Sequence, residues 1–344
     1  MTSAAAKLPT RQLGRGGPQV TTLGYGAMGL RTSYGPAGTD EERFVILDAA
    51  YDRGLLFWDT ADVYGDNEDL LGKWFKLTGK RDEIFLASKF GAGVLPNGEV
   101  FIRSDPEYVF EACEKSLKRL GVDCIDLYYH HRLDMKTPIE KTVAAMVELK
   151  KQGKIKYLGL SEISADTLRR AHTVHPITAI QVEYSPFSMD IENPQIGLLK
   201  LAKELGVAVI AYSPLGRGML TGLYRSPDDF PEDDIRRIMP RFSKENFAKN
   251  FELVEKIAAF AKQKGCTPGQ LTLAWIFRQW DMIFPIPGTK KIKYLEENIG
   301  ALDVKLIDEE DTKIRDAIEA AEVIGGRYSD IFSSNLLADT PPLE

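Results

Sequence analysis

Short apolar segments alternate with helix-forming segments along almost the whole chain, and this alternation constrains the fold more than any other feature of the sequence. Each apolar segment is a continuous run, which is typical of strands whose two faces are both covered in a parallel sheet. Strands that alternate with helices favour βαβ units. Eight such segments are present, namely LGYG, LLFWDT, EIFLASK, CIDLYYHH, YLGLS, ITAIQVEYS, VAVIAYS and MIFPIPG.

Helix-start signals separate the apolar segments. Thr39–Glu42 and Ser104–Glu107 have the pattern of capping boxes, and Thr137–Glu140 combines a cap, a proline at the first helical position and a box. Two further helices are expected between the last two strands, after a charged loop at residues 225–241. The remaining helices are expected over residues 67–78, 164–175 and 193–206.

The pattern predicts an α/β fold of one domain over residues 1–344, a (β/α)8 TIM barrel with an N-terminal β-hairpin at 11–26 and extra helices in and after the last units. We expect residues 1–10 to be flexible and the tail 325–344 to lie near the substrate mouth. A doubly wound open sheet is the rival fold. It is disfavoured because no strand runs into a G-x-G-x-x-G helix entry.

The composition points to a small-molecule partner. The net charge is -6 over 344 residues, which gives no electrostatic reason to expect nucleic acid or an anionic membrane. The amino end lacks the apolar core of a signal peptide, and no run reaches the ~18 apolar residues of a spanning helix. We therefore expect a cytoplasmic protein whose three cysteines, Cys113, Cys124 and Cys266, are reduced core residues.

Polar side chains follow three consecutive predicted strands. Asp59 and Tyr64 come after the second strand, Lys89 ends the third, and His130 and His131 end the fourth. Because the carboxyl ends of parallel strands meet at one edge of a barrel, we expect these side chains to lie together. A phenol delivers a proton near neutral pH only if a nearby cation stabilises its phenolate, since its ordinary pKa is ~10. These residue types therefore predict an acid–base site.

Two glycine-containing segments suit phosphate groups. Ser213–Gly222 can wrap a pyrophosphate with backbone N–H groups and Arg217. Gly288 and Thr289 precede Lys290 and Lys291 at a predicted helix start, where a helix amino end and ammonium groups suit a 2′-phosphate. The alternative for the second segment is a solvated basic turn.

Ten motifs in this order carry a resemblance to the aldo-keto reductases over nearly the whole length, most of all to the auxin-induced or perakine-reductase-like branch. The resemblance implies an eight-stranded barrel that uses a nicotinamide cofactor without a Rossmann domain. The motifs are LGYGAMGL, WDTADVYG, ASKFG, DLYYHHR, YLGLSE, QVEYS, AYSPLGRGMLTG, IPIPGT, LEENIGAL and ADTPPL.

The resemblance implies a role for each polar strand-end residue. Tyr64 would be the general acid that protonates a carbonyl oxygen as hydride arrives, Lys89 would lower the pKa of Tyr64, and Asp59 would pair with Lys89. His131 would bond the substrate carbonyl, so that Tyr64 and His131 bind the substrate. His131 is chosen because it is the fifth residue after Asp126, as in the family. Strand alternation also lets only one of the two histidines face the mouth.

The cofactor implied by the resemblance is NADP(H). Ser161 and Gln181 would bond the nicotinamide carboxamide, and Tyr212 would stack on its ring. Tyr294 stands where many relatives have an arginine that neutralises the 2′-phosphate, so NAD(H) use stays an alternative. The predicted cofactor-binding residues are Gly26, Ala27, Met28, Asp59, Ser161, Gln181, Tyr212, Ser213, Pro214, Leu215, Gly216, Arg217, Gly218, Gly288, Thr289, Lys290, Lys291, Glu297 and Asn298.

The expected activity is NADPH-dependent reduction of aldehydes and ketones to alcohols. The expected substrates are small molecules, and no metal site is expected. One alternative is a cofactor-binding regulatory subunit with poor turnover, as the resemblance to potassium-channel beta subunits allows. The other is a Schiff-base aldolase that uses Lys89 as nucleophile. The sequence leaves monomer and homo-oligomer undecided. An apolar mouth is expected from Tyr25, Met28, Phe90, Phe187, Tyr328 and Phe332.

Overall fold

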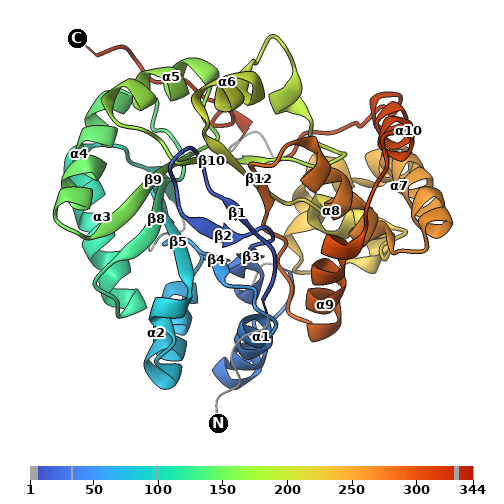
Figure 1. The fold of residues 1–344 in the computed structure, drawn as a ribbon, viewed down its shortest axis with the longest axis horizontal. Helices are drawn as coiled ribbons and strands as arrows, with labels where there is room; N and C mark the ends of the chain where they lie inside the picture. The colour runs from blue at the N-terminus through green and yellow to red at the C-terminus, as the bar shows by residue number, and fades with distance from the viewer. Residues whose placement is uncertain (1–6, 32–33, 96, 98, 329–332, 344) are drawn as a thin grey trace.

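Eight parallel strands curl around a common axis at the centre of this computed structural model, which describes residues 7–31, 34–95, 97, 99–328 and 333–343 (Figure 1). The strand order follows the chain, so each strand lies beside the next one in sequence. The strands are β3 (Tyr25–Gly26), β4 (Phe57–Asp59), β5 (Phe85–Phe90), β8 (Ile125–His130), β9 (Ile155–Ser161), β10 (Ala179–Glu183), β11 (Ala208–Tyr212) and β12 (Ile283–Pro285).

The first and last strands of the sheet meet at a seam that closes the barrel. The N–H of Gly24 donates to the carbonyl of Pro285 at 3.0 Å, and the N–H of Gly26 donates to the carbonyl of Pro287 at 3.3 Å. The approach is so close that a Cβ on Gly26 would lie 2.6 Å from the carbonyl oxygen of Ile286. Only glycine fits at this position. The seam closes the ring of eight strands, and the predicted (β/α)8 barrel is confirmed.

Helices surround the sheet on its outer face (Figure 1). Most follow a barrel strand directly, whereas α7 and α10 are the additional helices that the sequence predicts in and after the last units. The helices are α1 (Asp40–Asp52), α2 (Asn67–Thr78), α3 (Pro106–Leu120), α4 (Ile139–Lys151), α5 (Ala165–Val174), α6 (Leu198–Leu205), α7 (Lys244–Lys264), α8 (Pro268–Gln279), α9 (Ile292–Gly300) and α10 (Asp308–Glu319).

The predicted N-terminal hairpin closes the amino end of the barrel. Its strands are β1 (Thr10–Gln12) and β2 (Gln19–Thr21). Leu13 and Val20 are buried in one cluster with barrel residues such as Phe57 and Leu127. The burial of this apolar surface seals the end of the barrel opposite the strand ends that carry the polar side chains. The site must therefore open at the other end.

Helix starts differ from two of the predictions. Asp105, not Ser104, caps α3, because the Asp105 carboxylate accepts from the N–H of Tyr108. Ser104 and Thr137 instead bond Asp134, whose carboxylate accepts from the N–H of Ser104 and from the hydroxyl of Thr137. The half-buried Asp134 competes for these partners, so α4 begins without a side-chain cap. The capping box of Thr39 with Glu42 is confirmed.

Two segments also depart from the expected pattern. The loop after β5 contains two short paired strands, β6 (Ala92–Val94) and β7 (Val100–Ile102). Helix α6 begins at Leu198, five residues after its predicted start at Asn193.

Of the three cysteines, all free, Cys113 is buried while Cys124 and Cys266 are half-buried. Among the helices that the structure describes, none is long and apolar enough to cross a membrane.

Candidate active site

Lys89 joins the polar residues at the ends of β4 and β5. Its ammonium group lies 2.5 Å from Oδ1 of Asp59, donates to the carbonyl of Thr60 at 2.8 Å, and lies 3.5 Å from the hydroxyl of Tyr64. Lys89 is fully buried and Asp59 is 3% exposed. A charged ammonium in this position needs such partners, because an unpaired buried charge is costly.

Parallel register brings these groups to one edge of the barrel. Asp59 is the last residue of β4 and pairs with Ala87 on β5, two residues before Lys89. The loop after β4 then turns back, because the N–H of Asp62 donates to the carbonyl of Lys89 at 3.0 Å. This bond places Tyr64 above the Lys89 side chain. The spacing of Asp59 and Tyr64 in the WDTADVYG motif thus follows from the geometry of one tight loop.

The pKa values in the site show opposing effects. Burial raises the pKa of Tyr64, and the charge of Lys89 opposes that rise without cancelling it. For Lys89, burial acts to lower the pKa, but Asp59 and Tyr64 together raise it above its ordinary value. In this structure the charge of Lys89 acts to lower the pKa of Tyr64. The net pKa in this structure is nevertheless above the usual phenol value, because desolvation is the larger effect.

The two neighbouring histidines face different surroundings. The His131 ring meets the Tyr64 ring edge to face, with 5.9 Å between centroids. His130 is fully buried, and its ring packs against Phe90 at 5.1 Å. Burial lowers the pKa of His130 to about 4 and the pKa of His131 well below its ordinary value. Both rings are therefore neutral at pH 7, and His131 is the one beside the phenol.

The predicted carboxamide-binding residues lie next to the Lys89–Asp59 pair. Gln181 donates through Nε2 to Oδ2 of Asp59 at 2.8 Å. Ser161 lies opposite Gln181 in the β9–β10 register, and both are almost completely buried. The Ser161 hydroxyl also accepts from Arg132 at 3.1 Å. Side-chain contacts thus link β10 with β4 across the barrel, and β9 with the residues that follow β8.

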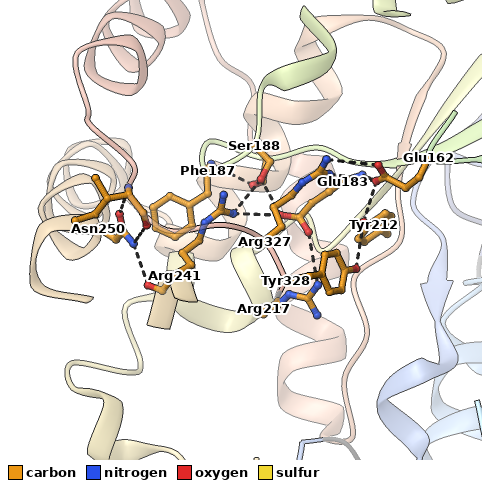
Figure 2. Close-up of polar contacts among 12 residues, drawn as sticks. Glu162, Glu183, Phe187, Ser188, Tyr212, Arg217, Arg241, Asn250, Arg327 and Tyr328 are labelled. Carbon is orange, nitrogen blue, oxygen red and sulfur yellow. Dashed lines mark hydrogen bonds and ion pairs between the residues drawn. The ribbon is translucent and has the colours of Figure 1, made fainter. Parts of the chain in front are cut away.

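A second polar cluster follows the ends of β9, β10 and β11 (Figure 2). Its centre is Glu162, which is fully buried and has a φ of 51°. The Glu162 carboxylate accepts from the Tyr212 hydroxyl at 2.8 Å, from the N–H of Glu183 at 3.0 Å and from the guanidinium of Arg327 at 3.2 Å. A left-handed backbone at a glutamate is unfavourable, and these three bonds account for its persistence.

Glu162 also holds the tail on its far side. Its carbonyl accepts from the N–H of Ala338 at 3.1 Å, while the carbonyl of Ala338 accepts from the N–H of Ser164 at 3.0 Å. Arg327 and Ala338 therefore both attach to the same residue. Tyr328 donates its hydroxyl to that of Tyr212 at 3.2 Å. Among the described tail residues, Arg327, Tyr328 and Ala338 thus contact residues that lie at or just after the ends of β9 and β11.

Glu183 organises the outer half of the same cluster. Its carboxylate accepts from the hydroxyl of Ser188 at 2.7 Å, pairs with Arg241 at 3.2 Å and lies 3.7 Å from Arg217. The guanidinium of Arg217 lies over the Tyr328 ring, 4.9 Å from its centroid. Two arginines thus share one carboxylate beside the predicted pyrophosphate loop, which leaves this region with an excess of positive charge.

The loop after β11 has the conformation of an anion-binding turn. Ser213, Gly216, Arg217 and Gly218 all have positive φ angles, between 48° and 92°. Successive residues of this kind point backbone N–H groups toward one side. Gly216 also lets Phe187 pack closely, since a Cβ there would lie 2.7 Å from the Phe187 ring. This loop conformation is compatible with a pyrophosphate at residues 213–218, and that site stays a prediction.

The segment after β12 meets the first helical turn of α9. No side chain caps α9, so N–H groups of its first turn are free for an anion. Lys291 is exposed there, with its ammonium 5.7 Å from the Tyr294 ring. Lys290 instead donates to the carbonyls of Tyr34, Gly35 and Pro36. In this structure Lys290 therefore anchors a loop and does not extend toward the helix end.

Several predicted residues have other partners. Glu297 accepts from the hydroxyl of Thr267 at 2.6 Å. Tyr25 and Phe90 are fully buried, and Tyr25 donates to the carbonyl of Thr289, so both belong to the core and not to an apolar mouth. Phe187 is likewise buried. Phe332 lies outside the described residues.

Several charged members of the site have no role in the prediction made from the sequence. Arg132 and Glu183 lie inside the motifs DLYYHHR and QVEYS, so their place in a motif at a strand end was the available signal. Arg241 and Arg327 lie in segments whose fold cannot be derived from local patterns. Their contacts depend on the tertiary structure.

Comparison with known sequences identifies the family of this site. The sequence model described as "Aldo/keto reductase family" matches residues 22–319. The chain belongs to the aldo/keto reductase family. It is 54% identical to aldo-keto reductase str7 of Strobilurus tenacellus over 342 residues, 98% of this chain and 99% of that protein. It is 53% identical to aldo-keto reductase yakc [NADP(+)] of Schizosaccharomyces pombe over 339 residues, again 98% and 99%.

Solved structures of other aldo-keto reductases have the same barrel. The thermostable aldo-keto reductase Tm1743, solved with the inhibitor epalrestat, superposes with a TM-score of 0.72 at 29% identity, covering 90% of this chain and all of that one. The glycerol dehydrogenase AKR11B4 from Gluconobacter oxydans superposes with a TM-score of 0.79 at 28% identity, covering 93% and 97%. The predicted family is confirmed, while the branch within it stays a prediction.

Proposed function

We propose that this protein reduces aldehydes or ketones to alcohols with NADPH, and that Tyr64 is the proton donor. The observation that carries the proposal is the placement of the Lys89 ammonium between Asp59, at 2.5 Å, and the Tyr64 hydroxyl, at 3.5 Å, with His131 edge-on to the same phenol. A phenol, a cation that stabilises its phenolate and a neutral imidazole suit protonation of a carbonyl oxygen.

The described residues fit a nicotinamide cofactor. Ser161 and Gln181 present a hydroxyl and an amide at the base of the site, beside Asp59. The positive-φ loop at 213–218 and Arg217 suit a pyrophosphate, and the uncapped start of α9 suits a further phosphate. The bound cofactor would supply the hydride. The name of the Schizosaccharomyces pombe relative includes NADP(+), which supports the phosphorylated cofactor.

The residues of this chain would then perform the proton chemistry. Tyr64 donates its hydroxyl proton to the carbonyl oxygen, and Lys89 stabilises the phenolate that remains. Asp59 keeps the buried ammonium in position and charged. His131 is neutral because burial lowers its pKa, so its ring can donate one hydrogen bond to the same oxygen without bringing a second charge. A protonated, paired Lys89 is a poor nucleophile, which argues against the aldolase alternative.

Two measurements on the purified protein test the proposal. The first is a fluorescence titration with NADPH and NADH in parallel, in which we expect clear NADPH binding and weaker NADH binding. The second compares Tyr64→Phe with the parent in NADPH-dependent reduction of an aromatic aldehyde. We expect kcat to fall by ~10²- to 10⁴-fold with nearly unchanged NADPH affinity, because only the donated proton is lost.

A matched control is Tyr157→Phe. Tyr157 is a half-buried tyrosine on β9 that pairs with Leu127 in the amino-terminal part of the sheet. Its substitution removes a phenol hydroxyl away from the site and should leave kcat unchanged. Unaltered turnover in Tyr64→Phe would disprove the acid assignment. Absence of binding to either nucleotide would overturn the reductase proposal as a whole.

A further inference from the structure

Arg132 is a charged residue in the site that the proposed proton chemistry does not use. It follows His131 directly, at the end of β8. Its guanidinium donates to the carbonyl of His131 at 2.7 Å and to the hydroxyl of Ser161 at 3.1 Å. Both acceptors are neutral, and the side chain cannot lose its charge, because arginine stays protonated in proteins. The site therefore holds a permanent cation beside its proposed acid and hydrogen-bond donor.

The carboxylates of the site are already paired with other cations. Asp59 pairs with Lys89. Glu162 pairs with Arg327, and Glu183 pairs with Arg241 and Arg217 (Figure 2). Within the described part of the chain, no carboxylate forms an ion pair with Arg132. A partly buried guanidinium without a counter-ion is unfavourable unless a ligand provides one.

The position of Arg132 selects the kind of ligand. The hydroxyls of Tyr212, Tyr328 and Tyr64 and the carboxylate of Glu162 all act on its pKa against the effect of burial, so these groups surround it. Of these four, Tyr64 belongs to the proton site together with His131, and Tyr328 belongs to the tail that lies over it. The loop and helix start that suit the cofactor phosphates lie after β11 and β12, on other strands. The anion beside Arg132 would thus belong to the substrate.

We propose that Arg132 binds a carboxylate on the substrate, and that the protein prefers carbonyl compounds that carry such a group. This inference rests on the proposed carbonyl reduction. A planar guanidinium matches a carboxylate in two-point contact, which fixes orientation as well as charge. Arg132 is then a specificity-determining residue, since it contacts the substrate away from the carbonyl that reacts. Its contact with the substrate exists before the transition state, so it acts mainly on KM.

The test uses pairs of substrates that differ only in charge. The 2-, 3- and 4-carboxybenzaldehydes are compared with their methyl esters at saturating NADPH, in the parent and in Arg132→Gln. For at least one isomer we expect the parent to prefer the acid by roughly 10- to 100-fold in kcat/KM, the range that a hydrogen bond to a charged group supplies. In Arg132→Gln this preference should vanish through a higher KM for the acid, while ester reduction changes little.

Further variants separate direct contact from general electrostatics and from loss of folding. Arg132→Lys keeps the charge without the two-point geometry and should retain part of the preference. Arg225→Gln removes an exposed cation from the loop after β11, and this variant should retain the whole preference for the acid. If Arg132→Gln does not fold, competitive inhibition of the parent by 4-methylbenzoate and by 4-methylbenzamide gives the same comparison, and the acid should bind more tightly.

Two results would overturn the inference. One is equal kcat/KM for acid and ester in the parent for all three isomers. The other is a parallel loss for acid and ester in Arg132→Gln together with weaker NADPH binding by fluorescence, which would show that Arg132 serves the cofactor amide through Ser161. Reduction of none of the aldehydes and esters by the parent would instead disprove the proposed function, and this result is distinct from the other two.

Discussion

The two halves of the barrel mouth are built differently. On the side of β4, β5 and β8, one buried cation, Lys89, joins one carboxylate and one phenol through a tight loop. On the side of β9, β10 and β11, two buried glutamates hold three arginines and Tyr212, which in turn accepts from Tyr328. The contact between Glu162 and Arg327 spans 165 residues of sequence. The first arrangement serves proton transfer with few groups. The second connects distant segments, so its main effect should be on the position of the tail.

The largest effect should follow from removing the cation of the first half. Lys89→Met should lower kcat by ~10²- to 10⁴-fold, because the phenolate of Tyr64 loses its stabilising charge. The same loss raises the pKa of Tyr64 further, so the alkaline limb of the residual activity should move to higher pH. The measurement is the pH profile of single-turnover reduction.

Lys89→Met also leaves Asp59 as an unpaired buried charge, which should cost ~3–5 kcal/mol of unfolding free energy in urea. The double variant Lys89→Met/Asp59→Asn is the control. It removes both charges and should recover most of the stability without recovering turnover. A single variant with the parental pH profile would show that Lys89 does not tune the acid.

The second half should respond in stability and tail protection more than in chemistry. Glu162→Gln leaves the buried Arg327 without its carboxylate and should cost ~3–5 kcal/mol. Hydrogen exchange should also rise at the N–H groups of Ala338 and Ser164, which are bonded around Glu162. Urea unfolding and exchange measured by mass spectrometry check both results.

Two variants sharpen this prediction. Glu162→Asn should be less destabilising than Glu162→Gln, because asparagine tolerates the φ of 51°. Glu162→Gln/Arg327→Met removes both charges and should be more stable than Glu162→Gln alone. Equal exchange in the parent and in Glu162→Gln would show that the ion pair does not hold the tail.

A moderate effect is expected from the histidine that faces away from the phenol. Burial lowers the pKa of His130 to about 4, so the unfolded chain binds more protons than the folded one below pH 6.5. Stability should therefore fall as the pH falls from 6.5 to 4, with a loss of ~3 kcal/mol from this residue. His130→Leu should remove this share of the pH dependence in urea titrations at several pH values, while His131, whose pKa burial also lowers, should retain its own share. His172→Asn changes a half-buried histidine on a helix and should leave most of the pH dependence of stability unchanged.

The smallest effect concerns the cofactor. Tyr294→Arg adds a guanidinium to the first turns of α9, near Lys291 and Lys293, and should tighten NADPH binding by about 10-fold while NADH binding stays the same. Fluorescence titration with both nucleotides measures this. Tyr294→Gln controls for loss of the ring. An equal gain for both nucleotides would place the new charge at the pyrophosphate and not at the 2′-phosphate.

The difference between the halves also explains what could be predicted from the sequence. Asp59, Tyr64 and Lys89 lie at strand ends that periodicity reveals, so their approach follows from the barrel alone. Arg327 lies in a tail with no periodic pattern, and its partner is fixed only once the tail has crossed the mouth. Two helix starts were predicted wrongly for a similar reason. The half-buried Asp134 takes bonds from Ser104 and Thr137 that a local capping rule assigns to the helices.

The seam between β3 and β12 bears on how the chain acquires this fold. Pro285 and Pro287 accept hydrogen bonds across the seam and have no N–H with which to return them, so Gly24 and Gly26 are the donors there. During synthesis β3 leaves the ribosome long before its neighbour β12 exists. One edge of β3 therefore stays unpaired until nearly the whole chain has been synthesised. Pairing between strands so far apart in sequence is slow to form. Closure of the ring is therefore expected to be a late folding step, and a truncated nascent chain should expose that edge to chaperones.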